Sequence, residues 1–74
     1  MKDIFIHPTA LAEPEEIGSG TSVWAYSHIM AGARVGRNCN IGDHCFVEGG
    51  ASIGDNVTVK NGNMIVVADE AAVG

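Results

Sequence analysis

Residues 17–65 read IGSGTSVWAYSHIMAGARVGRNCNIGDHCFVEGGASIGDNVTVKNGNMI, and an aliphatic residue returns at every sixth position. These positions are Ile17, Val23, Ile29, Val35, Ile41, Val47, Ile53, Val59 and Ile65, and Leu11 extends the series one period earlier. A helix cannot keep them on one face, because six residues of α-helix advance the chain by about 600°. The period favours short strands joined by tight turns.

Three such hexads per turn give a triangular prism of 18-residue coils, stacked about 4.8 Å apart. Residues one full coil apart then lie above one another. This spacing predicts three outward faces: Ser22, Asn40 and Thr58 beside Trp24, Gly42 and Lys60; His28, Phe46 and Met64 beside Met30, Glu48 and Val66; Arg34 and Ser52 beside Gly36 and Gly54. At the corner before the second face, it places Tyr26 under His44, and Ala25 under Asp43 and Asn61.

With this repeat, residues 11–66 resemble the hexapeptide-repeat proteins, which fold as left-handed parallel β-helices. The resemblance implies an all-β, single-domain chain of about three to four coils that forms trimers. The opening is closer still, in Ile6-His7-Pro8-Thr9-Ala10-Leu11, Val23-Trp24-Ala25-Tyr26-Ser27-His28 and the segment 32–42. It looks like the N-terminal part of the N-acetyltransferases that acylate the 3-amino group of nucleotide-linked sugars, which implies acetyl-CoA as a co-substrate.

The second outward face is the apolar one. Apolar side chains stacked in water would cost solubility, so we expect this face to meet neighbouring subunits in a homotrimer. The expected interface residues are His28, Met30, Phe46, Met64 and Val66.

Aromatic and imidazole side chains gather near the corner that leads onto this face. We expect one wall of a sugar-nucleotide site there, with rings for stacking and polar groups for hydrogen bonds. Its candidate residues are Trp24, Tyr26, His28, His44 and Asn61. The alternative is that the same rings fill the seam between subunits. The coil spacing fixes no carboxylate beside His28, which argues against a general base, and no catalytic residue is assigned.

The cysteine and histidine spacings argue against a metal centre. Cys39 and Cys45 are one hexad apart, which fits neither a CxxC zinc pair nor a dense disulfide framework, so we expect reduced, buried thiols. A remote alternative is the zinc site of the gamma-class carbonic anhydrases, which share the resembled fold. Those enzymes use two histidines five apart, whereas the gaps that separate His7, His28 and His44 are far wider.

The composition of the chain argues against several classes of binding partner. Four Lys plus Arg against nine Asp plus Glu give a net charge of −5, which opposes binding to nucleic acid or to an anionic membrane surface. No apolar run reaches the roughly 18 residues of a membrane span, and the N-terminus lacks the apolar core of a signal peptide. We therefore expect a cytoplasmic protein. A chain of 74 residues is short for an independent core, which also favours oligomerisation.

The repeat defines the expected boundaries. Residues 1–10 are assigned to a lead-in and cap, 11–66 to the β-helix, and 67–74 to a C-terminal tail. Asn63 and Asp69 interrupt the series at inward positions, so we expect the prism to stop after Ile65. An unpaired strand edge would result there, covered by the tail or by a second trimer packed end to end.

Two classes of function follow. The first is acetyl transfer to a nucleotide-linked amino sugar, weak or absent because the resembled enzymes take their acetyl-CoA groove and catalytic residues from segments that match nothing here. The second is a non-catalytic trimeric β-helix that serves as a scaffold or binding module.

Overall fold

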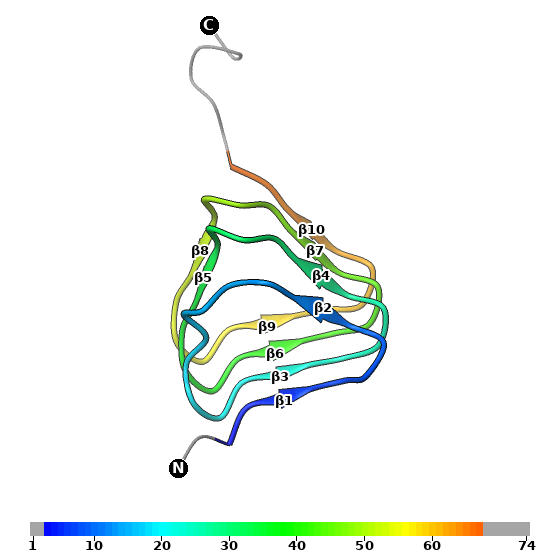
Figure 1. Ribbon diagram of the computed structural model, residues 1–74, viewed down its shortest axis with the longest axis horizontal. Coiled ribbons are helices and arrows are strands. Elements are labelled where there is room, and N and C mark those ends of the chain that lie inside the picture. Colours follow the sequence, from blue (N-terminus) through cyan, green and yellow to red (C-terminus); the bar gives the residue numbers. More distant parts are fainter. Residues whose placement is uncertain (1–2, 68–74) are drawn as a thin grey trace, which may run out of the picture.

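The computed structural model describes residues 3–67, in which the chain coils through ten two-residue strands (Figure 1). The strands are β1 (Phe5–Ile6), β2 (Leu11–Ala12), β3 (Ser22–Val23), β4 (His28–Ile29), β5 (Arg34–Val35), β6 (Asn40–Ile41), β7 (Phe46–Val47), β8 (Ser52–Ile53), β9 (Thr58–Val59) and β10 (Met64–Ile65). The strands are short because a turn follows every hexad. No helix in the described residues is long and apolar enough to cross a membrane.

Three parallel sheets form the sides of the prism. Sheet A runs β1-β3-β6-β9, sheet B runs β2-β4-β7-β10, and sheet C pairs β5 with β8. From β3 onward every strand pairs in the register that the sequence predicted, as for Ser22 with Asn40, His28 with Phe46, or Arg34 with Ser52. The predicted all-β parallel coil and its three outward columns are confirmed, with about three turns in the described residues.

The first coil departs from this regular spacing. Leu11 pairs with His28 and Ala12 with Ile29, which is one position short of a full coil, whereas the bridge from Ile17 to Val35 spans a full one. The segment 13–16 is therefore one residue shorter than its counterpart in the next coil. The prediction that Leu11 points inward was wrong: Ala12 takes the inward position, and Leu11 is 53% exposed.

The β-helix also begins earlier than expected. Strand β1 lies within residues 1–10, which had been assigned to a lead-in, and it pairs with β3 through Phe5 with Ser22 and Ile6 with Val23. The boundary at residue 11 was wrong, because Ile6 already supplies an inward aliphatic side chain. The predicted capping role of the tail lies outside the described residues, apart from Val67.

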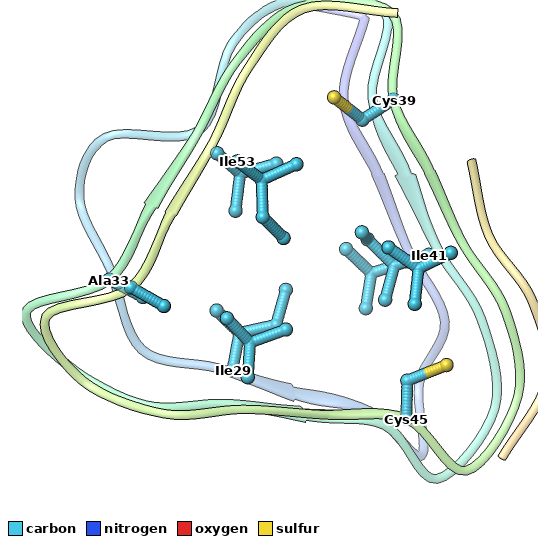
Figure 2. Close-up of a cluster of buried hydrophobic side chains, with 11 residues drawn as sticks. Ile29, Ala33, Cys39, Ile41, Cys45 and Ile53 are labelled. Atoms are coloured by element: carbon cyan, nitrogen blue, oxygen red, sulfur yellow. The ribbon is translucent and has the colours of Figure 1, made fainter. Parts of the chain in front are cut away.

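The core consists of aliphatic side chains that point toward the prism axis from all three sides and stack from coil to coil. Figure 2 shows Ile29, Ile41 and Ile53 pointing inward from the three sides, with Ala33, Cys39 and Cys45 near the three corners. Both cysteines are free and buried, as the sequence predicted. Small side chains stand at the corners because the chain turns there and leaves little room.

Corner side chains also link the coils. A hydroxyl or thiol at the inward corner position donates to a backbone carbonyl of the coil above. The four donors are Thr21 to Gly36, Ser27 to Gly42, Cys39 to Gly54 and Cys45 to Lys60. The Thr21 and Ser27 hydroxyls also accept from the backbone N–H of Cys39 and Cys45. These bonds explain why Thr, Ser and Cys share this position.

Ser27→Ala is expected to lower the thermal midpoint by roughly 10 °C. The change removes the donor to the Gly42 carbonyl and the acceptor for the Cys45 N–H inside the core, where Ser27 is 1% exposed. Calorimetry measures the shift. Ser27→Cys is the matched control, since Cys45 makes the same carbonyl contact one coil above. An alanine variant as stable as the parent would show that these bonds add little.

Candidate functional site

The candidate residues divide among three places on the prism surface. Trp24 follows β3 on sheet A, where its ring lies 5.0 Å from that of Phe5. Its indole Nε1–H donates to Asn40 Oδ1 over 2.9 Å. Trp24 keeps 39% of its surface exposed. The indole is thus anchored by a ring below and an amide above, with part of its area free for a ligand.

Tyr26 and His44 form the second group, at the corner between sheets A and B. Their rings stack with centroids 5.2 Å apart and planes 27° apart, as the predicted column requires. The Tyr26 N–H donates to the Thr9 hydroxyl in the coil below. The backbone N–H of His44 donates to the Ala25 carbonyl. Tyr26 is 63% exposed, so the stacked pair lies at the surface.

His28 belongs to the third group, on sheet B. Its ring meets Phe46 edge to face at 5.7 Å, and its Nε2 lies 3.0 Å from Glu13 Oε1. The expectation that no carboxylate stands beside His28 was wrong. The short first coil places Glu13 opposite Met30, on the same outward side as His28. A carboxylate that orients an imidazole is an arrangement found at general bases, and the regular coil spacing does not reveal this pair.

Hydrogen bonds hold Glu13 in place. Its Oε1 accepts from the Ala31 backbone N–H over 3.2 Å as well as contacting His28. The His28 contact, followed by the Ala31 N–H, lowers the pKa of Glu13 below its ordinary value of 4.5. Both contacts favour the ionised carboxylate. Glu13 therefore ties the short segment 13–16 to the second coil.

Acidification is expected to break the hydrogen bonds of Glu13 to His28 and to the Ala31 backbone. Because the pKa of Glu13 is lower in the folded chain, its contribution to stability is complete above its ordinary pKa and lost as the pH falls through the lowered value. A nuclear magnetic resonance titration should show the Ala31 amide shifting with a midpoint below 4.5. Glu13→Gln should abolish that step. A midpoint at or above 4.5 in the parent would contradict the contact.

The Asn61 side chain forms a hydrogen bond with the backbone of the neighbouring coil. Its Oδ1 accepts from the Asp43 N–H over 2.9 Å, and Asp55 Oδ1 accepts in the same way from Arg37 at another corner. The structure therefore brings Tyr26 and His44 together, and gives Trp24, His28 and Asn61 separate partners. The sequence predicted one cluster, whereas the structure divides these residues into three groups around one corner of the prism.

The three histidines are also dispersed. His7 Nδ1 lies 2.9 Å from the Thr9 hydroxyl, while His28 contacts Glu13 and His44 stacks on Tyr26. Within residues 3–67, no three His, Cys, Asp or Glu side chains gather in a way that could hold a metal ion.

The outward row of sheet B matches its predicted placement. His28, Phe46 and Met64 are direct strand partners in successive coils. Met64 is 67% exposed, and Leu11 joins the row below His28 because of the short first coil. The row is thus longer than expected, and its role as a subunit interface stays a prediction.

Two open hollows flank the segment 13–18, and no pattern in the sequence indicates them. One, of about 470 Å³, lies against sheet C beside Ile17, Arg34 and Ser52. The other, of about 390 Å³, lies beside Pro14, Ala31 and Arg34. The Arg34 guanidinium Nε sits 3.4 Å from Glu16 Oε1 between them, with both side chains largely exposed. The hollows result from the missing strand of sheet C in the first coil.

Comparison with known proteins relates this chain to acyltransferases. Residues 16–49 match the family described as bacterial transferase hexapeptide (six repeats). Over 60 residues, 80% of the chain, the sequence is 42% identical to the acyl-(acyl-carrier-protein)–UDP-N-acetylglucosamine O-acyltransferases of Brucella ovis, Brucella canis and Brucella abortus. The match spans 22% of the length of each of these relatives.

These relatives refine the resemblance seen in the sequence. They are named as O-acyltransferases of UDP-N-acetylglucosamine, not as N-acetyltransferases of 3-amino sugars. The family match and the strand pairing agree on a six-residue repeat. Residues 16–49 of this chain therefore match the bacterial transferase hexapeptide family, and the chain is similar over part of its length to these O-acyltransferases.

Proposed function

We propose that this chain takes part in acyl transfer to a nucleotide-linked amino sugar. The observation that carries the proposal is the 42% identity over 60 residues to enzymes named for acyl transfer to UDP-N-acetylglucosamine. In this proposal Trp24, Tyr26, His28 and His44 contribute to binding the acceptor. No catalytic residue is assigned among the described residues.

A direct assay tests the proposal. The purified chain is incubated with UDP-N-acetylglucosamine and either an acyl-(acyl-carrier-protein) or acetyl-CoA, and the nucleotide sugar is analysed by mass spectrometry. The expected product is an acylated nucleotide sugar formed from the carrier-protein donor. If neither product forms and calorimetry shows no binding of donor or acceptor, the non-catalytic scaffold replaces the transferase proposal.

N-acetylation of a 3-amino sugar is the second candidate. It is supported by the segments 23–28 and 32–42, which resemble those N-acetyltransferases. Mild base separates the two reactions, because an ester is hydrolysed and an amide is not. A base-stable product formed only with a nucleotide-linked 3-amino sugar and acetyl-CoA would favour this candidate over O-acylation.

Assembly is the other part of the proposal. We propose that left-handed prisms of this chain form a homotrimer in which sheet B meets a neighbouring subunit. The exposed apolar side chains Leu11, Met64 and Val66 along this sheet support the choice of face. Packing of two trimers end to end would cover the last strands.

Phe46→Asp is expected to dissociate the trimer, reducing the native mass to about a third. The change would bury an unpaired charge at the centre of the sheet B row, beside the His28 ring. Light scattering coupled to gel filtration measures the mass. Ser52→Asp on the exposed side of sheet C is the matched control. An unchanged mass for Phe46→Asp would mean that another face forms the interface, and a monomeric parent would refute the trimer.

A further inference from the structure

The corners of the prism impose the same backbone conformation every hexad. A positive φ occurs at Gly20, Tyr26, Gly32, Asn38, His44, Gly50, Asn56 and Gly62. Glycine adopts this left-handed region without strain, and asparagine and histidine are enriched there among the other residues, which accounts for all of these positions except Tyr26. A tyrosine there is a genuine outlier, because its Cβ crowds the backbone. Tyr26, at φ 59°, has the least suited side chain of the series.

The two bulky residues share one corner in successive coils. Tyr26 and His44 stack there, 5.2 Å between centroids, at the surface of the prism. Gly and Asn at the other corners show that the fold does not require rings at this position. Strained residues held by their surroundings are often found at ligand sites, so this pair is a candidate for binding.

The stack has room for a third ring. The next corner position above His44 is Gly62, whose N–H donates to the Asp43 carbonyl and keeps the coils in register. Among residues 3–67, no atom comes within 4 Å of a Cβ built on Gly62, so these residues leave open space where its side chain would begin. The column Tyr26, His44, Gly62 is therefore two rings followed by a gap.

Polar groups beside the gap suit a nucleotide. Asn61 Oδ1 is taken by the Asp43 N–H, while its Nδ2 group donates no hydrogen bond within the described residues. Amide N–H groups are donors for the carbonyl oxygens of a pyrimidine base. Lys60, exposed and close to the gap along the chain, supplies a cation for phosphate.

We propose that the base of a nucleotide-linked sugar stacks on His44, in the gap above the Tyr26–His44 pair, with Asn61 and Lys60 beside it. The identity of the base as uracil rests on the proposed function, through the UDP-linked acceptor named for the relatives. Stacking on an aromatic side chain is tolerant of base type, so the stack recognises any planar base. The Asn61 amide then discriminates between bases by hydrogen bonding to the edge of the ring.

Titration with uridine 5′-monophosphate tests the site, with ribose 5-phosphate as the probe that lacks the base. Two-dimensional nuclear magnetic resonance on the full chain should show saturable shifts at His44, Asn61 and Gly62 for the nucleotide alone. If the nucleotide produces no such shifts, or if ribose 5-phosphate produces the same ones, the proposal is overturned.

A blocking variant separates binding from folding. Gly62→Asn should fill the gap, because asparagine tolerates the positive φ and the space is open. The affinity for uridine 5′-monophosphate is expected to fall about tenfold or more, with the thermal midpoint within about 4 °C of the parent. Gly50→Asn, the same substitution at another corner, should leave the affinity unchanged. Undiminished affinity in Gly62→Asn would overturn the proposal.

A second variant removes the ring itself. His44→Asn keeps a residue that tolerates the corner, so affinity should fall about tenfold while the midpoint stays or rises. A drop in the midpoint by about 8 °C or more would show that the ring serves folding, against the proposal. Acyl transfer is measured in a separate assay. If the nucleotide binds but no transfer occurs, the proposed enzymatic function is refuted and the binding site stands. If transfer occurs and both variants bind the nucleotide with normal affinity, only the binding site is refuted.

Discussion

Gly36→Ala is expected to lower the thermal midpoint by roughly 10–20 °C, corresponding to about 2–3 kcal/mol. A Cβ on Gly36 would lie 2.7 Å from the carbonyl carbon and oxygen of Gly54, and would also strike Asp55 Oδ1. Backbone atoms of the next coil cannot move aside without breaking the pairing of β5 with β8. The variant therefore has to push two coils apart. Calorimetry or denaturant unfolding measures the loss.

Gly54→Ala is the matched control for this prediction. Gly54 stands in the same column one coil above, but none of the residues that the structure describes lies within 4 Å of its added Cβ, and its φ is not positive. The substitution should leave stability unchanged or raise it slightly, because alanine reduces the freedom of the unfolded chain. Equal losses at both positions would show that the column does not pack as closely as the structure indicates.

Ile41→Ala is expected to cost about 3 kcal/mol. Ile41 is 0% exposed and stands in the central column of sheet A, between Val23 in one neighbouring coil and Val59 in the other. Removing its side chain leaves a cavity that the rigid coils on both sides cannot close. A domain of this length is stable by only about 4–11 kcal/mol, so the loss is a large fraction of the total. Urea unfolding followed by Trp24 fluorescence measures it.

The comparison variant is Ile65→Ala. Within the part of the chain that the structure describes, Ile65 pairs only with Val47, and it is partly exposed, so the same truncation should cost about 1 kcal/mol. A loss at Ile65 as large as that at Ile41 would mean that the end of the prism is covered as fully as its middle.

The period of six was enough to predict the fold from residue 17 onward. Aliphatic side chains at fixed spacing define the inward face, and the regular coil then places every outward column, including the stack of Tyr26 on His44. The first coil could not be placed in this way. Ala12 is too small and too common to mark an inward position, so the larger Leu11 was chosen and the one-residue shortening of 13–16 stayed hidden.

The one-residue shortening of the first coil is also the reason why part of the candidate site could not be predicted. Because the first coil is one position short, Glu13 follows Leu11 on the outward side of sheet B and reaches His28. With the regular spacing it would lie below Ala31, away from that face. The corner strain at Tyr26 was likewise invisible, because a positive φ depends on the backbone path and the sequence shows only an aromatic residue where glycine or asparagine usually stands.

The coil spacing sets how this chain can fold. Strand partners always lie in successive coils, so no coil gains a ladder hydrogen bond until the chain has closed a loop as long as the coil itself. Closing such a loop costs about 2.5 kcal/mol of chain entropy. A lone coil is therefore unstable, and two stacked coils form the smallest nucleus. Each further coil repeats the same entropic cost of loop closure and the same gain from pairing with its neighbour. Folding proceeds as the lengthening of a linear array, which can start at any adjacent pair of coils.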